Sequence, residues 1–176
     1  DYYLRVVDRT GDGIVVRGAK LHTSVSVISN EVVVLPTRNL DEREKEYAVA
    51  FAVPINTPGI KMVTGVYSQE RESAFQFPLS KGHRMLETTT IFDDVFVPWD
   101  RVFMDGEYQY SGALALGFVD FHRYTAVSYK QPLLDLLVGS ALLIADYNGI
   151  SRMGHVRDKL AWLATYSETV KGLLRT

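Results

Sequence analysis

The feature that most constrains the fold is a change in apolar period near Met104. Before it, short runs rich in β-branched residues alternate with glycine- and proline-containing turns, a pattern typical of antiparallel strands. From Leu114 onward, apolar residues recur at three- and four-residue spacing, which indicates helices. The order predicts an α+β chain: an antiparallel β domain over residues 1–106, followed by the start of an α-helical bundle over residues 107–176.

Composition narrows the class of protein. The 176 residues are 47% hydrophobic and 23% charged, and the formal net charge of -2 gives no reason to expect a nucleic-acid partner. The longest apolar run, residues 133–145, is shorter than a membrane span, and we recognise no signal peptide, so we expect a cytoplasmic protein with no membrane partner. Cysteine is absent, which excludes disulfides and thiolate-bound metal sites in this sequence.

The chain begins in a strand pattern and stops in a helix pattern, so we expect it to be a piece of a longer protein.

Turn residues divide the β part into short strands. Strands over residues 3–8 and 14–17, joined by a turn that contains Asp12-Gly13, predict a hairpin. We expect further strands over residues 31–35, 47–53, 60–67, 88–92 and 95–97, a solvated charged loop over 41–46, and a turn at Asp93 and Asp94. In the second part we expect helices over residues 111–129, over residues 132–147 with Pro132 in the first turn, and from His155 onward.

A polar stretch over residues 17–24 follows the β-branched run at residues 14–16. Gly18 interrupts the strand pattern, and a glycine there often marks a bulge or a close approach of the backbone to another group. Hydroxyl, imidazole and amine groups follow it, so this predicted loop could line a cofactor. An ordinary strand that ends in a polar loop fits the same pattern.

Three longer stretches, residues 10–20, 47–59 and 91–103, resemble the 4-hydroxyphenylacetate 3-hydroxylase family, and the likeness covers essentially the whole chain. The order of a β domain and helices is similar to the acyl-CoA dehydrogenase architecture. The resemblance implies that FAD lies between the β domain and the bundle, with residues 17–24 against the flavin ring. The protein would then position and tune a ring that carries the redox chemistry.

On this resemblance, four residues of the polar stretch are the predicted cofactor-binding residues. They are Lys20, His22, Thr23 and Ser24. Thr23 and Ser24 would supply hydrogen bonds near the flavin ring, and His22 would flank it. A purely structural loop end remains the alternative.

A second set of motifs leans toward the 4-hydroxybutyryl-CoA dehydratase branch of the family. These are residues 103–108, 121–123, 145–150 and 155–160. The dehydratases carry FAD and a [4Fe–4S] cluster, and His122 stands at the position of a cluster ligand in that branch. Seven residues later, Tyr129 stands where the branch has a cysteine ligand, and a phenol cannot replace the thiolate. We therefore expect no iron–sulfur cluster and no metal site.

The resemblance to the dehydratase branch also gives the predicted catalytic residues, Glu87, His122 and Lys130. His122, free of iron, could act as a general base, because the imidazole pKa lies near neutrality. Glu87 could hold a proton if it is buried beside the flavin, and Lys130 could pair with an anionic group. A packed or solvated helix histidine, a surface strand glutamate and a solvated lysine are the ordinary alternatives.

The preferred function is monooxygenation, in which reduced FAD reacts with oxygen and a phenol-like substrate is hydroxylated. The reduced flavin would come from a separate reductase partner. The alternative is a flavin-dependent dehydratase or isomerase that acts on an acyl-CoA without a cluster. A third possibility is a non-catalytic scaffold or assembly subunit that has lost the site. The resemblance further implies a homo-oligomer, either a tetramer or a dimer.

Overall fold

The computed structural model describes residues 2–65, 73–82 and 86–175. The chain forms two compact units, Asp1–Leu116 and Gly117–Thr176. The first unit holds all the described strands, and the second is helical, so the antiparallel β part followed by helices is confirmed.

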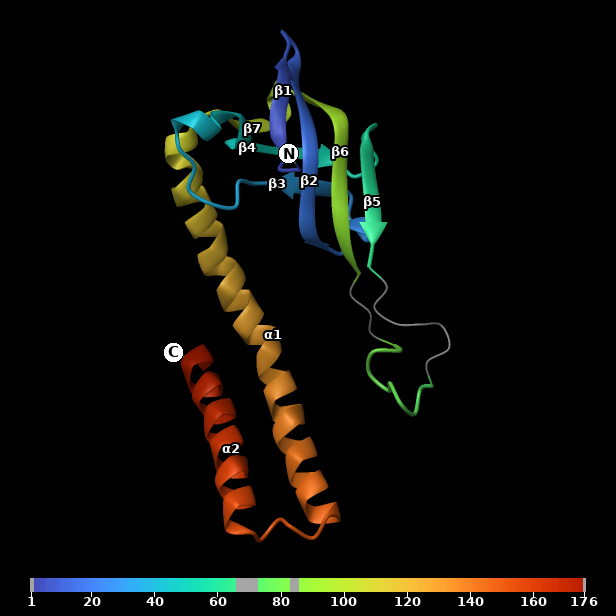
Figure 1. Cartoon of the computed structure of the whole chain (residues 1–176), viewed down its shortest axis with the longest axis vertical. Helices are drawn as coiled ribbons and strands as arrows, with labels where there is room; N and C mark the ends of the chain where they lie inside the picture. The colour runs from blue at the N-terminus through green and yellow to red at the C-terminus, as the bar shows by residue number, and fades with distance from the viewer. Residues whose placement is uncertain (1, 66–72, 83–85, 176) are drawn as a thin grey trace. The chain divides into compact units, whose positions relative to one another are not determined.

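Two antiparallel sheets form the first unit. The four-stranded sheet has the order β1 (Arg5–Arg9), β2 (Gly13–Ser24), β6 (Glu87–Pro98) and β5 (Ile60–Thr64). The three-stranded sheet has the order β3 (Glu31–Val34), β4 (Val49–Pro54) and β7 (Val102–Asp105). Short 3-10 helices lie at Ser26–Ile28, Glu42–Tyr47, Trp99–Arg101 and Tyr108–Tyr110. In Figure 1 the strands of the second sheet cross those of the first.

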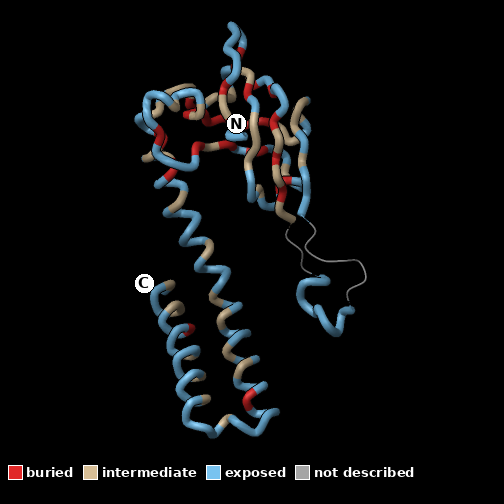
Figure 2. Tube along the Cα trace, viewed as in Figure 1, coloured by how far each residue is buried: buried red, intermediate tan, exposed pale blue. Residues whose placement is uncertain are grey.

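The core of this unit lies between the two sheets and consists of buried apolar residues from both. Figure 2 shows buried positions that alternate with more exposed ones along several of the strands. β4 is buried along almost its whole length, because its residues contact the other sheet on one face and neighbouring segments on the other. Phe51 of β4 meets Phe92 of β6 edge to face, with ring centroids 5.8 Å apart. This aromatic pair joins the two sheets.

The polar stretch over residues 17–24 is not a loop, because it is the second half of β2. Pairing with β6 continues to Ser24, with register shifts between Val16 and Gly18 and between Lys20 and Thr23. The two bulges accommodate the extra residues of β2, so the strand continues through the polar stretch. The predicted strand at 14–17 is therefore too short by seven residues, since β2 ends at Ser24.

Residues 88–92 and 95–97 are parts of one strand, β6, so the predicted turn at Asp93 and Asp94 is wrong. Asp94 takes a positive φ of 52° within the strand, and its carboxylate receives two hydrogen bonds from Arg17 of β2. Asp93 pairs with Lys61 of β5 at 2.7 Å. Cross-strand ion pairs thus hold these carboxylates on the sheet. The charged run at 41–46 is likewise ordered, as the 3-10 helix Glu42–Tyr47.

The helical part consists of α1 (Ser111–Tyr147) and α2 (Gly154–Arg175). α1 is one helix and passes through Pro132, where we expected a new helix to begin. A proline removes one backbone hydrogen bond and crowds the preceding turn, and a helix of 37 residues retains its other bonds on both sides. The last predicted helix agrees with α2 to within one residue at its start.

α1 and α2 are joined in the second unit by a cluster of hydrogen bonds around Asp135. Ser167 donates to Asp135 Oδ1 at 2.7 Å, and Lys171 Nζ lies 2.8 Å from the same oxygen. Gln131, one turn earlier on α1, donates to Oδ2 at 2.9 Å. These contacts, with Lys171 first, lower the pKa of Asp135 from 3.8 to about 2.

A depressed carboxylate pKa makes this part of the stability depend on pH. The contribution of Asp135 is fully present above the unfolded pKa of 3.8 and is lost as the pH falls through about 2. We expect the wild-type protein to exceed Asp135→Asn in Tm above about pH 4, with a gap that closes toward about pH 2. Thermal denaturation of the full-length protein across this range measures it. The exposed α2 position Asp158→Asn is the control, and an equal gap there would contradict the assignment.

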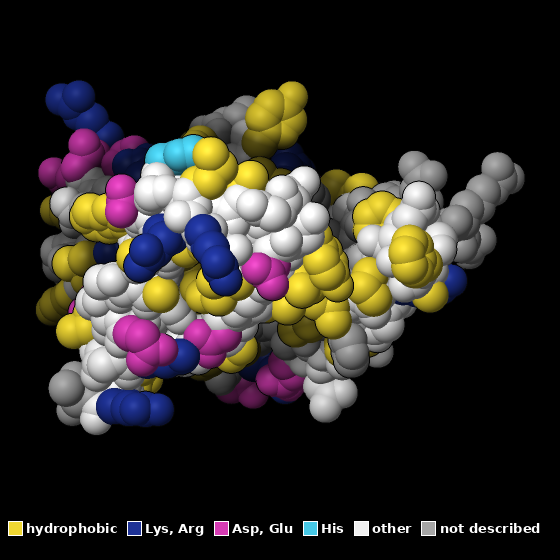
Figure 3. Space-filling view, turned by 90° about the horizontal axis from the view of Figure 1, so that it is seen from below, with side chains coloured by type: hydrophobic (Ala, Val, Ile, Leu, Met, Phe, Trp, Pro, Cys, Tyr) yellow, Lys and Arg dark blue, Asp and Glu magenta, His cyan; other side chains and the backbone are white. Residues whose placement is uncertain are grey.

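Large apolar side chains of both helices are exposed, among them Phe121, Leu136 and Trp162. Figure 3 shows the molecule from below, and on the surface seen there apolar side chains lie between charged ones. By length and composition, Tyr108–Tyr147 would also serve as a membrane span. The sequence alone predicted no run of that length, because Asp135 and Ser140 interrupt the longest apolar run at residues 133–145.

Candidate functional site

The predicted cofactor-facing residues lie at one end of the β2–β6 ladder. Thr23 is paired with Thr88, and Ser24 is paired with Glu87. His22 stands in the bulge with a φ of 59°, and Val25 follows the strand with a φ of 51°. Residues other than glycine seldom adopt positive φ, and such strained positions cluster at functional sites. This end of the ladder thus carries two strained positions among polar side chains.

Glu87 is the acidic centre of this end. The hydroxyl of Ser24 donates to Glu87 Oε1 in a short hydrogen bond. The exposed His22 ring has its Nδ1 4.0 Å from Glu87 Oε2. Oε2 is buried, and among the described residues it has no hydrogen-bond partner. A buried carboxylate oxygen without a donor is costly, so this atom marks a place where a bound group could supply one.

A layer of hydroxyl groups lies beneath Thr23. Thr90 donates to Thr23 Oγ1 at 3.1 Å, while Thr88 and Ser26 donate to the Thr23 carbonyl at 3.2 and 3.0 Å. Thr88, Thr90 and Ser26 are all buried. The sequence alone did not predict a role in the site for these three residues. The signal available was threonine at alternating positions 88 and 90 of a strand, where valine would be the ordinary core residue.

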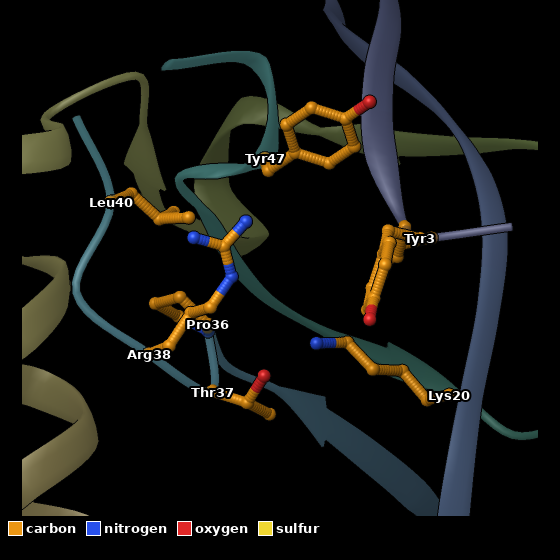
Figure 4. Close-up of a pocket in the computed structure, with 8 residues that line it drawn as sticks. Tyr3, Lys20, Pro36, Thr37, Arg38, Leu40 and Tyr47 are labelled. Atoms are coloured by element: carbon orange, nitrogen blue, oxygen red, sulfur yellow. The ribbon is translucent and has the colours of Figure 1, made fainter. Parts of the chain in front are cut away.

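Lys20 is directed to a different place from the Ser24–Glu87 pair. Its ammonium donates to the Leu35 carbonyl at 2.9 Å, and burial lowers its pKa. No carboxylate in the described part of the chain lies within ion-pair distance of it. Figure 4 shows it lining a pocket together with Tyr3, Leu4, Pro36, Thr37, Arg38, Leu40 and Tyr47. Arg38, in contrast, is paired with Glu44.

The predicted catalytic residues of the helical part stand apart from one another. His122 and Lys130 are both exposed on α1, eight residues or about 12 Å apart along the helix axis. The His122 ring stacks on Phe118 with centroids 5.3 Å apart. Both residues belong to the second unit and Glu87 to the first, so a joint catalytic role for the three residues stays a prediction.

The described residues contain no group of three histidine, aspartate or glutamate side chains close enough to hold a metal ion. The candidate site therefore consists of one acidic centre, Glu87, with hydroxyl groups and an imidazole around it. Such a set can donate and accept hydrogen bonds and can hold a proton.

The fold is similar to that of acyl-CoA dehydrogenases. A glutaryl-coenzyme A dehydrogenase structure matches 94% of the chain with a TM-score of 0.66 at 17% identity, which establishes the architecture alone. Family models narrow the assignment. The N-terminal model of 4-hydroxyphenylacetate 3-hydroxylase matches residues 1–104, and the C-terminal model matches residues 111–176. The chain is a member of the 4-hydroxyphenylacetate 3-hydroxylase family.

Two curated relatives represent two activities within this family. The 4-hydroxybutyryl-CoA dehydratase/vinylacetyl-CoA-Delta-isomerase of Clostridium aminobutyricum is 37% identical over 97% of this chain and 36% of its own length. The 4-hydroxyphenylacetate 3-monooxygenase oxygenase component of Thermus thermophilus is 34% identical over 94% of this chain and 35% of its own length. The chain thus spans about a third of the relatives that it matches.

A solved structure adds ligands to the comparison. The oxygenase component of 4-hydroxyphenylacetate 3-monooxygenase, in complex with FAD and 4-hydroxyphenylacetate, matches 98% of this chain and 36% of its own, with 32% identity and a TM-score of 0.85. The match extends over both units of the present chain.

Proposed function

We propose that the protein to which this chain belongs is an FAD-dependent monooxygenase that hydroxylates a phenolic substrate. Family membership supports this function, as do the relatives named as oxygenase components and a similar structure that holds FAD and a phenol. The observation in this chain that carries it is the buried Glu87 Oε2, which lacks a donor at a strained, polar strand end.

The residues at this end fit a flavin ring. The isoalloxazine edge offers N–H and carbonyl groups, and the chain offers hydroxyl, imidazole and carboxylate groups in return. Thr23, Ser24 and His22 would hold the ring, and Glu87 Oε2 would accept the hydrogen bond that it lacks. Reduced FAD, when bound, supplies the electrons for the reaction with oxygen.

The side chains at this strand end would orient and hold the flavin ring, while the flavin itself carries the redox change. The Ser24 hydroxyl fixes one oxygen of Glu87, so the second oxygen has a defined direction. His22, on the exposed side of the bulge, would exclude water from the ring or exchange a proton with Glu87. His122 and Lys130 are proposed to act from the helical domain, with residues 1–106 as the flavin-facing domain and 107–176 as the bundle.

The Lys20 ammonium, which lies beside aromatic side chains, suits the acidic group of an anionic aromatic substrate. A half-buried ammonium without a carboxylate partner attracts an anion, because desolvation without a counter-charge is unfavourable. Tyr3 and Tyr47 supply aromatic surface beside it (Figure 4). We propose that the acidic group of a phenolic acid lies here, which makes Lys20 a substrate residue as well as a candidate cofactor residue.

The proposed monooxygenase takes its reduced flavin from a separate reductase. The relatives named as oxygenase components support such a partner, and they also support a small-molecule substrate. We further propose that the protein is a cytoplasmic homo-oligomer, a dimer or a tetramer, and that the exposed apolar face of α1 packs on protein and not on lipid. Crystallised relatives that match this segment support that assignment of the face.

The second candidate function is a cluster-free dehydratase or isomerase acting on an acyl-CoA. The dehydratase of Clostridium aminobutyricum has a higher sequence identity to this chain than the monooxygenase of Thermus thermophilus has, and Glu87, His122 and Lys130 are retained on the resemblance. Tyr129, at the position where the resemblance places a cysteine ligand, argues for a reaction without the cluster.

Turnover separates the two functions. The full-length protein, supplied with chemically reduced FAD and 4-hydroxyphenylacetate, is expected to consume oxygen and release a hydroxylated product. With 4-hydroxybutyryl-CoA under anaerobic conditions we expect no conversion. Conversion of the thioester without oxygen would overturn the monooxygenase proposal in favour of the second function, and no turnover or flavin binding would leave a scaffold.

We expect Ser24→Ala to weaken flavin binding about three- to tenfold, because one hydrogen bond to the flavin or to Glu87 is lost. The measurement is a fluorescence titration of the full-length variant with FAD. Ser73→Ala, which removes a hydroxyl from an exposed turn, is the matched control. Equal affinities of wild type and Ser24→Ala would contradict the assignment of this strand end.

A further inference from the structure

The hydroxyl layer under Thr23 is unusual for its position in the core. β6 presents Phe92, Val95 and Val97 to the apolar core and then, at its other end, Thr88 and Thr90. Threonine and valine have nearly the same shape, and a buried hydroxyl is unfavourable unless it is hydrogen-bonded. The two hydroxyls therefore need a role that valine would not meet.

The hydrogen bonds of this layer converge on one residue. Thr90 donates to the side chain of Thr23, and Thr88 and Ser26 donate to its carbonyl. The hydroxyl oxygens of Ser26 and Thr88 lie 2.7 Å apart and those of Thr88 and Thr90 lie 3.1 Å apart, so the three hydroxyls form one continuous layer. Thr23 is thereby held at both its backbone and its side chain.

The held residue lies between two strained ones. His22 and Val25 both have positive φ, and a conformation of this kind persists only where surrounding contacts over-determine it. The Thr23 hydroxyl accepts from Thr90, so its own proton remains for a partner outside the layer. The Thr23 carbonyl accepts hydrogen bonds from the hydroxyl layer, which fixes the peptide plane between Thr23 and Ser24.

We propose that Thr88, Thr90 and Ser26 are positioning residues that set the Thr23 hydroxyl as an outward donor to the flavin. The inference rests on the proposed function and extends it to residues that do not touch the cofactor themselves. Loss of a layer hydroxyl leaves the shape of the core intact and releases the strand end from its strained conformation.

The test uses three variants of the full-length protein. Thr90→Val keeps the shape and removes the donor, while Thr90→Ser keeps the donor and removes a methyl group. Thr89→Val is the matched control, because residue 89 lies between the two layer threonines and alternation directs it to the opposite face of β6. Titration with reduced FAD under anaerobic conditions gives the affinity of each.

A second readout needs no flavin. Hydrogen–deuterium exchange of the apoprotein reports on the backbone amides of Val25, Ile28 and Ser29, which donate to Leu86, Val25 and Ser26. We expect faster exchange at these amides and about five- to tenfold weaker flavin binding in Thr90→Val. Thr90→Ser should stay within about twofold of wild type in affinity, and Thr89→Val should match wild type in both readouts.

Three results would overturn the inference. Wild-type affinity and exchange in Thr90→Val would show that the layer does not position Thr23. An equal defect in Thr90→Ser or in Thr89→Val would show that packing, and not the hydroxyl, is responsible. Absence of flavin binding by the wild type would instead contradict the proposed function, and it would remove the inference with it.

Discussion

Gly18→Ala is expected to destabilise the protein by more than about 3 kcal/mol and to abolish flavin binding. Gly18 has a φ of 139°, in a region that other residues rarely adopt. A Cβ there would lie 2.5 Å from Leu4 Cα and 2.6 Å from both Leu4 N and the Tyr3 carbonyl oxygen. All three atoms are backbone, so the Tyr3–Leu4 segment that leads into β1 would have to move away from β2.

We expect flavin binding to be lost together with stability, because β2 continues from Gly18 to the proposed flavin-binding residues Thr23 and Ser24. Chemical denaturation of the full-length variant measures the stability, and a flavin titration measures the site. Gly11→Ala is the control, since a Cβ at that turn position would meet nothing within 4 Å. A Gly18→Ala protein as stable as Gly11→Ala would contradict the described packing of β1 on β2.

Phe92→Ala is expected to cost about 3–5 kcal/mol of unfolding free energy, through lost burial and the cavity left behind. Phe92 is 1% exposed and makes the edge-to-face contact with Phe51 that joins the two sheets. Neighbouring strands on both sides fix the backbone of β6, so the surrounding structure has little room to collapse into the space.

The same substitution on the same strand provides the control. Phe96 of β6 is 44% exposed, so Phe96→Ala should cost about 1 kcal/mol or less. Urea denaturation of both full-length variants gives the two free energies. Equal costs would contradict the placement of Phe92 in the core between the sheets.

The change of period near Met104 was sufficient to predict the β part and the helical part, because it reports directly on backbone geometry. Predictions from local sequence were wrong where pairing with neighbouring strands determined the structure. The polar residues 17–24 and the acidic pair at Asp93 and Asp94 look like loops, yet pairing with neighbouring strands keeps them in β2 and β6. Pro132 looks like a helix start, and a long helix tolerates it.

The candidate site was predictable only in part. The sequence pointed to Thr23, Ser24 and Glu87, and the structure brings Ser24 and Glu87 into contact across 63 positions of chain. No local pattern reveals such a contact, because it depends on the β2–β6 register. For the same reason Thr88, Thr90 and Ser26 were missed, and Lys20 was grouped with neighbours from which its side chain turns away.

The most direct test of the central claim is an anaerobic titration of the full-length protein with oxidised and with reduced FAD, followed by flavin absorbance. We predict much tighter binding of the reduced form, because an oxygenase that depends on a separate reductase must capture reduced flavin from solution. Tight retention of oxidised FAD would contradict the monooxygenase account and favour the acyl-CoA function. Binding of neither form would contradict both functions.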